Sequence, residues 1–210
     1  MPLYTSDLAG LLGNRVDFAS TALLPMPLSV PVGRDALPAV CRELGFRNGA
    51  EIGVWKAGFS RKLCDGAPGM HLLCVDPWQK YDGWEDGKNS PDMNIEAAYQ
   101  IARETLKGCN ATIVRAFSED ALLDVPDRSL DFVYIDGNHQ RAAVLEDVTE
   151  WALKVRPGGI VAGHDYRVFP NKPYIQVVAA LQDYTAVHEI RPWFQLIGDR
   201  TPSWLWVVRG

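Results

Sequence analysis

Acidic residues stand just after several short apolar runs in this 210-residue chain. Asp76 and Asp136 each follow four apolar residues, and His164-Asp165 comes shortly after Ile160-Val161-Ala162. Short uninterrupted apolar runs are typical of strands in a parallel sheet that is covered on both faces. Ligands of such sheets bind beyond the carboxyl ends of the strands. These polar side chains are therefore candidates for ligand binding or catalysis.

A glycine-bearing segment precedes the first of these acids, and it reads Glu51-Ile52-Gly53-Val54-Trp55-Lys56-Ala57-Gly58-Phe59-Ser60. Glycine lets a ligand approach the main chain closely, and a following helix points free N–H groups toward that ligand. The spacing of Gly53 and Gly58 is also that of an ordinary strand–helix turn. Asp76, 23 residues after Gly53, could accept hydrogen bonds from two ribose hydroxyls. The pair indicates a nucleoside ligand, which S-adenosylmethionine and NAD would both satisfy.

Two features of this turn favour S-adenosylmethionine. The NAD fingerprint requires three closely spaced glycines against a pyrophosphate, whereas Trp55 and Lys56 stand where the later glycines would be. Glu51, at the end of the first strand, suits a cationic ammonium group and would repel a diphosphate.

A second group of polar residues lies at the ends of the later strands. Asp136 and Asp165 are expected to end adjacent strands, so their carboxylates can converge with His164 as a metal site. Oxygen ligands suit Mg²⁺, and an imidazole shifts the preference toward a softer metal. Asp136 and His139 are the predicted catalytic residues, with His139 as a general base that accepts a hydroxyl proton. The alternative is structural: His164 and Asp165 tie down a loop, and His139 makes local hydrogen bonds.

Strand-like and helix-like segments alternate along most of the chain, which is typical of a parallel sheet with crossover helices. The predicted strands are 50–54, 72–75, 111–115, 132–135, 160–162, 187–190 and 204–208. The predicted helices are 36–44, 59–64, 95–106, 118–123, 144–155 and 174–184, the fourth with Ser118 as its N-cap. No helix separates the last two strands, so we expect them to pair antiparallel at one side of the sheet. The predicted fold is α/β and Rossmann-like, with a seven-stranded, mostly parallel sheet, an antiparallel last strand and helices on both faces.

The helix predicted over 144–155 is amphipathic. Its apolar face comprises Val144, Val148, Trp151, Ala152 and Val155. The charged residues Glu146, Asp147, Glu150 and Lys154 are expected largely outside that face.

Composition limits the class of protein. A net charge of −5, a pI near 5.4 and the lack of a basic stripe argue against a nucleic-acid partner. No apolar stretch approaches the roughly 18 residues of a membrane span, and no secretory signal stands at the N-terminus. The four cysteines lack a CxxC spacing and are expected to be buried thiols of a reducing compartment. We therefore expect a cytoplasmic protein that acts on a small molecule, and a homo-oligomer is compatible with the sequence.

No internal repeat or linker divides the chain. We expect one domain over residues 1–210, with a Rossmann-like core at 37–210. Residues 1–36, punctuated by prolines, are expected to be a lead-in segment that packs on the core or caps the active site.

Five motifs together resemble one family. They are Glu51-Ile52-Gly53-Val54-Trp55 through Ser60, Val75-Asp76-Pro77-Trp78, residues 131–139 (DFVYIDGNH), Arg156-Pro157-Gly158-Gly159 and Gly163-His164-Asp165-Tyr166. This set resembles the class I methyltransferases of the "methyltransferase domain 24" type, which are related to bacterial natural-product O-methyltransferases. One departure is that, in the acid-x-Gly-x-Gly-x-Gly turn of these proteins, only the first glycine is kept in register. Residues 1–36 and 79–98 carry no motif and are where substrate choice is expected.

The resemblance implies a role for each matching position. It implies that S-adenosylmethionine is the cofactor and that related proteins hold a divalent metal at the ends of the two strands that precede Asp136 and Asp165. The residues implied for the methionine part are Glu51, Gly53, Trp55, Gly58 and Ser60; for the ribose, Asp76 and Trp78; for the adenine, Phe117, Ser118 and Glu119; and under the sulfonium, Asp136.

The sequence thus predicts a methyltransferase that acts on a small molecule, with a hydroxyl oxygen as the expected acceptor and with or without assistance by a metal. Two alternatives are an NAD-linked oxidoreductase of doubly wound fold and a non-catalytic module that binds S-adenosylmethionine.

Overall fold

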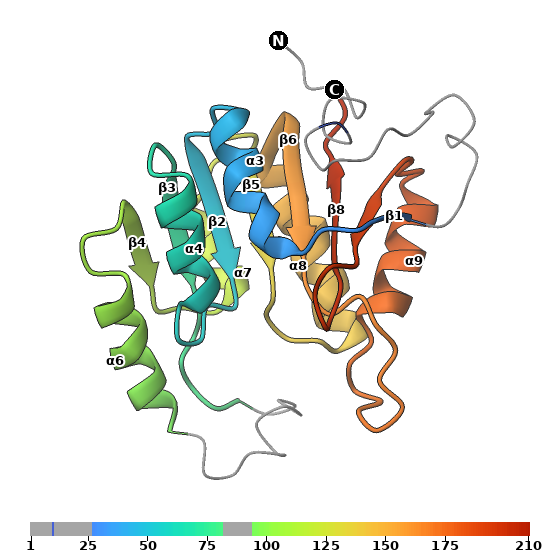
Figure 1. Ribbon diagram of the computed structural model, residues 1–210. Coiled ribbons are helices and arrows are strands. Elements are labelled where there is room, and N and C mark those ends of the chain that lie inside the picture. The colour runs from blue at the N-terminus through green and yellow to red at the C-terminus, as the bar shows by residue number, and fades with distance from the viewer. Residues whose placement is uncertain (1–9, 11–26, 82–93) are drawn as a thin grey trace.

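The protein is built around one twisted sheet of eight strands. The computed structural model describes residues 10, 27–81 and 94–210. Across the sheet in Figure 1 the strands run in the order β1-β7-β8-β6-β5-β2-β3-β4. Their bounds are β1 Leu28–Val30, β2 Asn48–Ile52, β3 His71–Val75, β4 Ala111–Val114, β5 Leu130–Ile135, β6 Val155–Gly163, β7 Phe194–Leu196 and β8 Ser203–Val207. Strand β8 runs antiparallel to both β6 and β7, and the other pairs are parallel.

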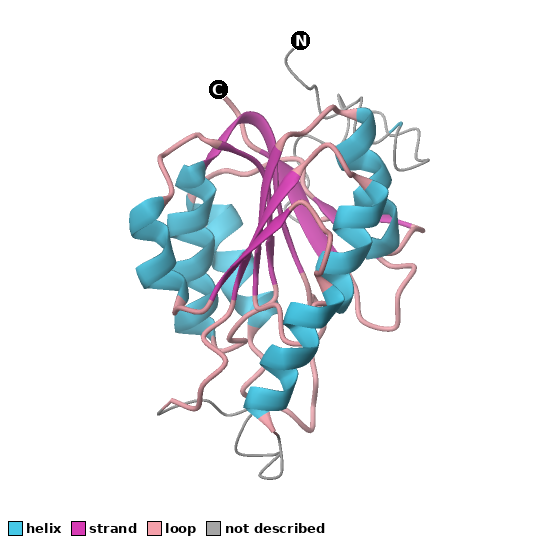
Figure 2. Cartoon of the chain, turned by 90° about the vertical axis from the view of Figure 1, so that its left-hand side faces the viewer, coloured by secondary structure: helices cyan, strands magenta, loops and turns pink. Residues whose placement is uncertain are grey.

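Helices cover both faces of this sheet, as the edge-on view in Figure 2 shows. One face carries α3 (Leu37–Glu43), α4 (Gly58–Gly66) and α6 (Ile95–Thr105), and the other carries α7 (Ser118–Ala121), α8 (Arg141–Lys154) and α9 (Val177–Val187). Two short 3₁₀ turns, η1 (Arg34–Ala36) and η2 (Leu122–Asp124), adjoin α3 and α7. The predicted Rossmann-like α/β class is confirmed. In the described part of the chain, no helix is long and apolar enough to cross a membrane.

Strand β5 is buried at every position, because helices of both layers pack against it. It lies between β2 and β6, and Ile135 at its end pairs with Gly163 of β6. The next residues, Asp136 on one strand and His164-Asp165 on the other, therefore emerge side by side at the carboxyl edge. The prediction that Asp136 and Asp165 follow adjacent strands is confirmed.

The prediction of a strand at 187–190 is wrong. Val187 is the last residue of α9 and is 77% exposed, because the buried face of that helix is formed by residues 177, 180, 181, 184 and 185. The strand that precedes β8 is instead β7, at Phe194–Leu196. It pairs antiparallel with β8, as the last two strands were expected to do.

An eighth strand comes from the segment predicted to be an irregular lead-in. Residues Leu28–Val30 pair with β7 in parallel at one edge of the sheet. Strand β6 also begins earlier than predicted, at Val155 directly after α8. Both differences depend on pairing between distant segments, which periodicity along the chain does not report.

Candidate functional site

The turn after β2 has an unusual backbone. Gly53, Trp55 and Ala57 have φ angles of 87°, 51° and 60°, all in the left-handed region that favours glycine. These are the alternate positions that hold glycine in the acid-x-Gly-x-Gly-x-Gly turn. Left-handed backbone, which glycine favours, is therefore present here with Trp and Ala at the second and third of these positions. A left-handed conformation costs a non-glycine residue on the order of 1 kcal/mol or more, so neighbouring groups must hold it in place.

Asp76 is the group that holds this turn. Its Oδ2 accepts hydrogen bonds from the backbone N–H groups of Val54 (3.0 Å) and Trp55 (2.9 Å), and its Oδ1 accepts one from Trp78 (2.8 Å). The indole Nε1 of Trp78 donates in turn to the carbonyl of Trp55 at 2.7 Å. Burial raises the pKa of Asp76 above its ordinary value, and the three N–H groups oppose that rise. The predicted ribose acid thus also organises the turn next to it.

Gly53 cannot be replaced without moving β5. A Cβ atom at this position would lie 2.1 Å from the carbonyl oxygen of Asp136. The N–H of Asp136 in turn donates to the carbonyl of Ile52 at 2.7 Å. The glycine therefore allows the ends of β2 and β5 to approach each other closely.

A cavity of about 730 Å³ opens at the carboxyl ends of β2, β3, β4 and β5. Its volume is in the range of small-molecule sites. Of the predicted cofactor residues, those that line it are Glu51, Gly53, Trp55, Gly58, Asp76, Trp78, Phe117, Ser118, Glu119 and Asp136. Ser60, in α4, is fully buried and is not among the described residues that line the cavity. Of the predicted catalytic residues, both Asp136 and His139 line the cavity.

Glu51 carries a buried carboxylate with an unused oxygen. The residue is only 2% exposed, and within the described residues neither its Oε2 nor the Ser60 hydroxyl has a hydrogen-bond partner. Burial raises the pKa of Glu51 to about 8, and the nearby charge of Asp136 adds to the rise while that of Arg34 opposes it. A buried acceptor without a donor is costly. The part of the cavity next to Glu51 is therefore suited to a ligand that brings a positively charged N–H donor.

Arg34 is a site residue that the sequence did not reveal. Its Nη1 donates to Asp136 Oδ2 at 3.3 Å, and its guanidinium lies 5.1 Å from the ring centre of Phe59. Its backbone N–H donates to Asp199 Oδ2 at 2.6 Å, which anchors η1 beside the cavity. No motif surrounds Arg34, and contacts with residues distant along the chain, Asp136 and Asp199, hold it here.

Asp147 also lines the cavity, from α8. It is only 8% exposed and lies on the same face as Val144, Val148 and Trp151. Its position corrects the expectation that the charged residues of this helix lie largely outside the apolar face. The hydroxyl of Ser118 donates to Asp147 Oδ1, and the indole Nε1 of Trp151 donates to the Ser118 hydroxyl at 2.7 Å. Ser118 is the first residue of α7, so it is not the N-cap that the sequence suggested.

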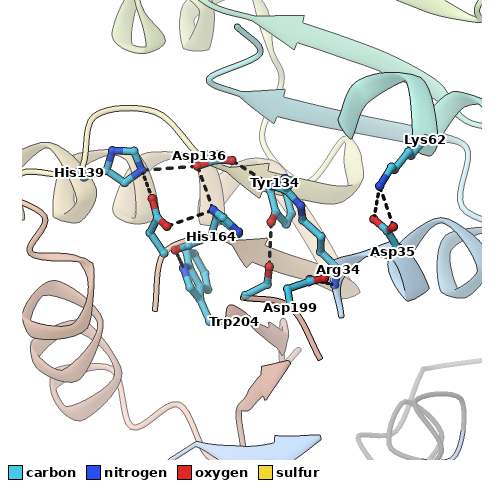
Figure 3. A network of polar contacts seen from close by, with 11 residues as sticks. Arg34, Asp35, Lys62, Tyr134, Asp136, His139, His164, Asp199 and Trp204 are labelled. Carbon is cyan, nitrogen blue, oxygen red and sulfur yellow. Dashed lines mark hydrogen bonds and ion pairs between the residues drawn. The ribbon is translucent and has the colours of Figure 1, made fainter. Parts of the chain in front are cut away.

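Two carboxylates and two imidazoles form a cluster that includes the lining residues Asp136 and His139, and Figure 3 shows these two residues together with His164. His139 Nε2 is 2.8 Å from Asp165 Oδ2 and 3.5 Å from Asp136 Oδ1. His164 Nδ1 is 3.3 Å from Asp165 Oδ1 and 3.7 Å from Asp136 Oδ1. Burial acts to raise the pKa of Asp165, but its contacts with both histidines outweigh burial and hold the pKa below its ordinary value.

The structure brings a different set of candidate metal ligands together than the sequence suggested. Among the described residues, one ligand atom from each of Asp136, His139 and Asp165 lies within 4.8 Å of the others. The sequence prediction was Asp136, His164 and Asp165. His164 contacts both carboxylates from the other side and is absent from the described lining of the main cavity.

A Rossmann-like sheet with a cavity at the carboxyl ends of its strands is typical of proteins that bind nucleoside cofactors. Within that class, the methyltransferase domain family matches residues 49–166, which is more than half of the 210-residue chain. The chain therefore belongs to the methyltransferase domain family. This match confirms the resemblance drawn from the motifs.

A relative of known sequence is distant from this chain. The chain is 26% identical over 142 residues to the uncharacterized protein R132 of Acanthamoeba polyphaga mimivirus, covering 65% of this chain and 58% of that relative. The chain thus spans less than two thirds of that relative's length.

Solved structures with a similar fold include two O-methyltransferases. TomG from Streptomyces achromogenes, solved with S-adenosylmethionine (SAM), has a TM-score of 0.62 and 18% identity, over 84% of this chain and 79% of TomG. The O-methyltransferase of Bacillus cereus, in complex with S-adenosylhomocysteine (SAH), has a TM-score of 0.62 and 18% identity, over 83% of this chain and 80% of its own. At this identity the likeness supports the Rossmann-like fold.

Proposed function

We propose that this methyltransferase transfers the methyl group of SAM to a hydroxyl oxygen of a small molecule. The proposal rests on the excess of acidic over basic side chains that line the cavity. The acidic side chains among the described lining residues are Glu51, Asp76, Glu119, Asp136, Glu146 and Asp147, against two basic side chains, Arg34 and Lys56. An enclosed acidic lining attracts a cationic ligand and repels a diphosphate. The sulfonium of SAM fits this lining, whereas the pyrophosphate of NAD does not.

The two signs of charge near β2 fit the amino-acid end of SAM. The unused oxygen of Glu51 is suited to the ammonium group, and Arg34, which lines the same cavity, is suited to the carboxylate. Asp76, at the end of the next strand, would then accept from the ribose hydroxyls through lone pairs that its backbone hydrogen bonds leave free. The adenine would lie toward Phe117 and Ser118, after β4.

The chemistry required of the protein is modest. When bound, SAM supplies a methyl carbon already activated by the sulfonium, so an oxygen held in line can displace a neutral thioether. Positioning of two reactants can contribute on the order of 7–11 kcal/mol. The chain must also remove the hydroxyl proton. His139 lines the cavity and can accept that proton, and Asp165 at 2.8 Å can stabilise the resulting imidazolium.

A metal-assisted variant of this reaction is favoured by one observation. The two carboxylates and one imidazole of Asp136, His139 and Asp165 converge within 4.8 Å, and such a donor set suits a divalent cation. These residues would hold the ion, which would orient the acceptor and acidify its hydroxyl. In that case His139 is a ligand and the base is another group, so the two assignments exclude each other.

Calorimetric titration tests the cofactor assignment. We expect saturable binding of SAH and no binding of NAD⁺. Saturable NAD⁺ binding without a response to SAH would instead support the oxidoreductase. Turnover is tested by the release of SAH in the presence of a panel of phenolic and aliphatic hydroxyl compounds, and Gly53→Val should abolish it. Binding of SAH without turnover on any acceptor would favour the non-catalytic module.

A cytoplasmic location is part of the same proposal. The four cysteines are free thiols in the structure, with Cys41, Cys64 and Cys74 buried as expected and Cys109 partly exposed. Unpaired buried thiols are typical of proteins in a reducing compartment.

A further inference from the structure

Trp78 is a buried residue of the cavity wall with a strained backbone. It is only 2% exposed, and its φ angle of 40° lies in the left-handed region that is unfavourable for a residue with a side chain. Its N–H donates to Asp76, and its indole Nε1 donates to the carbonyl of Trp55, which has a left-handed backbone as well. A contact that holds Trp78 in place therefore also holds the turn after β2.

Arg115 makes such a contact from outside the cavity. It directly follows β4, the edge strand of the sheet, and its Nη2 donates to the carbonyl of Trp78 at 3.0 Å. Arg115 is not among the described residues that line the cavity. Any effect of Arg115 on a ligand must therefore pass through another residue.

Two side chains of α6 hold the guanidinium of Arg115. Its Nη2 lies 2.9 Å from Glu96 Oε2, and the guanidinium lies 4.4 Å from the ring centre of Tyr99. The ring of Tyr99 in turn packs against that of Trp78, with 4.9 Å between the ring centres. The side chains of Arg115 and Glu96 are 39% and 57% exposed, so their ion pair contributes little to the stability of the fold.

The charge of Arg115 also acts on Asp76. Burial raises the pKa of Asp76, and the charge of Arg115 acts together with the three backbone N–H groups against that rise. Arg115 therefore favours the ionised form of the carboxylate around which the turn is organised.

We infer that Arg115 is a positioning residue of this methyltransferase. By holding the carbonyl of Trp78, it keeps the indole of Trp78 on the carbonyl of Trp55, and so keeps the turn after β2 in the conformation that binds the cofactor. This inference rests on the proposed function, because it requires that the turn bind SAM. Arg115 itself touches neither the cofactor nor the acceptor.

The first test is calorimetric titration of the whole protein with SAH. Arg115→Met keeps an extended side chain and removes the charge and the donors. We expect SAH affinity to fall about tenfold, as for the loss of one hydrogen bond to a charged group, with one binding site per chain retained. Arg103→Met is the matched control, because Arg103 is exposed and its guanidinium lies 5.8 Å from the ring centre of the same Tyr99. We expect unchanged SAH affinity in that variant.

A double-mutant cycle separates positioning from a merely structural role. Trp78→Phe keeps an aromatic ring and removes the indole N–H that Trp55 accepts. If Arg115 acts through that donor, adding Arg115→Met to Trp78→Phe should weaken SAH binding by no more than about twofold. Losses that are additive in the double variant contradict the inference. A merely structural role of Arg115 would lower the fraction of chains that bind SAH and leave the affinity of the remainder unchanged.

The other outcomes are also decisive. Unchanged SAH affinity in Arg115→Met overturns the inference. If Arg115→Met does not fold, Glu96→Gln removes the exposed partner of the guanidinium instead. The expected loss of affinity is then about two- to threefold, in the range of an exposed ion pair, and an unchanged affinity again overturns the inference. A wild type that does not bind SAH contradicts the proposed function itself, which is a different result.

Discussion

After β5 and β6, the carboxylates of Asp136 and Asp165 lie next to an arginine and a histidine, whereas between α7 and α8 the carboxylate of Asp147 lies next to a hydroxyl and other acids. Asp136 lies 3.3 Å from Arg34, and Asp165 lies 2.8 Å from His139. Among the described residues, the hydrogen-bond partner of Asp147 is the Ser118 hydroxyl. Charges paired within the protein are ordered before a ligand arrives. An acidic side chain without a described cationic partner, like that of Asp147 or Glu51, instead indicates that the ligand must supply a hydrogen-bond donor.

The largest effect is expected at Gly53, which allows the ends of β2 and β5 to approach each other closely. Gly53→Val would place a Cβ 2.1 Å from the Asp136 carbonyl at a φ of 87°. We expect loss of detectable SAH binding and a loss of stability of about 3 kcal/mol or more, measured by urea denaturation. Gly58→Ala is the matched control for stability, because its Cβ would meet nothing within 4 Å. Normal stability in Gly53→Val would contradict the close approach of β2 and β5.

The paired carboxylates predict a defect in turnover with little change in binding. His139→Gln removes the proposed base, and a general base typically contributes about 10²- to 10⁴-fold to the rate. We expect kcat to fall by that factor with nearly unchanged SAH affinity, measured by steady-state kinetics and calorimetry. Treatment with EDTA separates the two assignments of His139. Activity that is lost with EDTA and restored by a divalent cation would identify His139 as a ligand rather than as a base.

The unpaired acids predict that stability depends on pH. Burial raises the pKa of Asp147 to about 7 and of Glu51 to about 8, whereas both titrate near 4 when unfolded. The folded state therefore holds protons that the unfolded state releases. The resulting stability is fully present below about pH 4 and is lost as the pH rises through about 7 and then 8. We expect the free energy of unfolding to fall by a few kcal/mol between pH 5.5 and 8.5, measured by urea denaturation.

Two variants locate the origin of this pH dependence. Glu51→Gln and Asp147→Asn should each flatten the profile, since an amide does not titrate. A profile that is equally steep in both variants would assign the dependence to other groups.

The smallest predicted effect concerns the unused oxygen of Glu51. Glu51→Gln keeps an acceptor but removes the charge, so we expect SAH affinity to fall about tenfold. Methylthioadenosine lacks the amino-acid part, and its affinity should not change. An equal loss for both ligands in calorimetry would place the contact of Glu51 elsewhere on the nucleoside.

Much of the site could be predicted from the sequence, because it depends on local pattern. Asp76 and Asp136 were found from the apolar runs before them, and Gly53 from the acid and glycine of its turn. The failures share one cause. Arg34, Asp147 and strand β7 owe their positions to contacts between segments that are distant along the chain. Val187 was also misassigned, because β-branched side chains are typical of strands. In the structure it ends α9 and lies outside the buried face of that helix.

The sequence by itself determined the class of fold, the family and the carboxyl edge at which ligands bind. These follow from short-range rules, because apolar runs form strands and the residues after them must lie at the strand ends. Only the tertiary structure decided which charges are paired. The pairing of β1 with β7 brings Arg34 to Asp136, and the packing of α8 on α7 buries Asp147 against Ser118. Charge pairing depends on distances of a few ångströms across the fold, and spacing along the chain does not encode those distances.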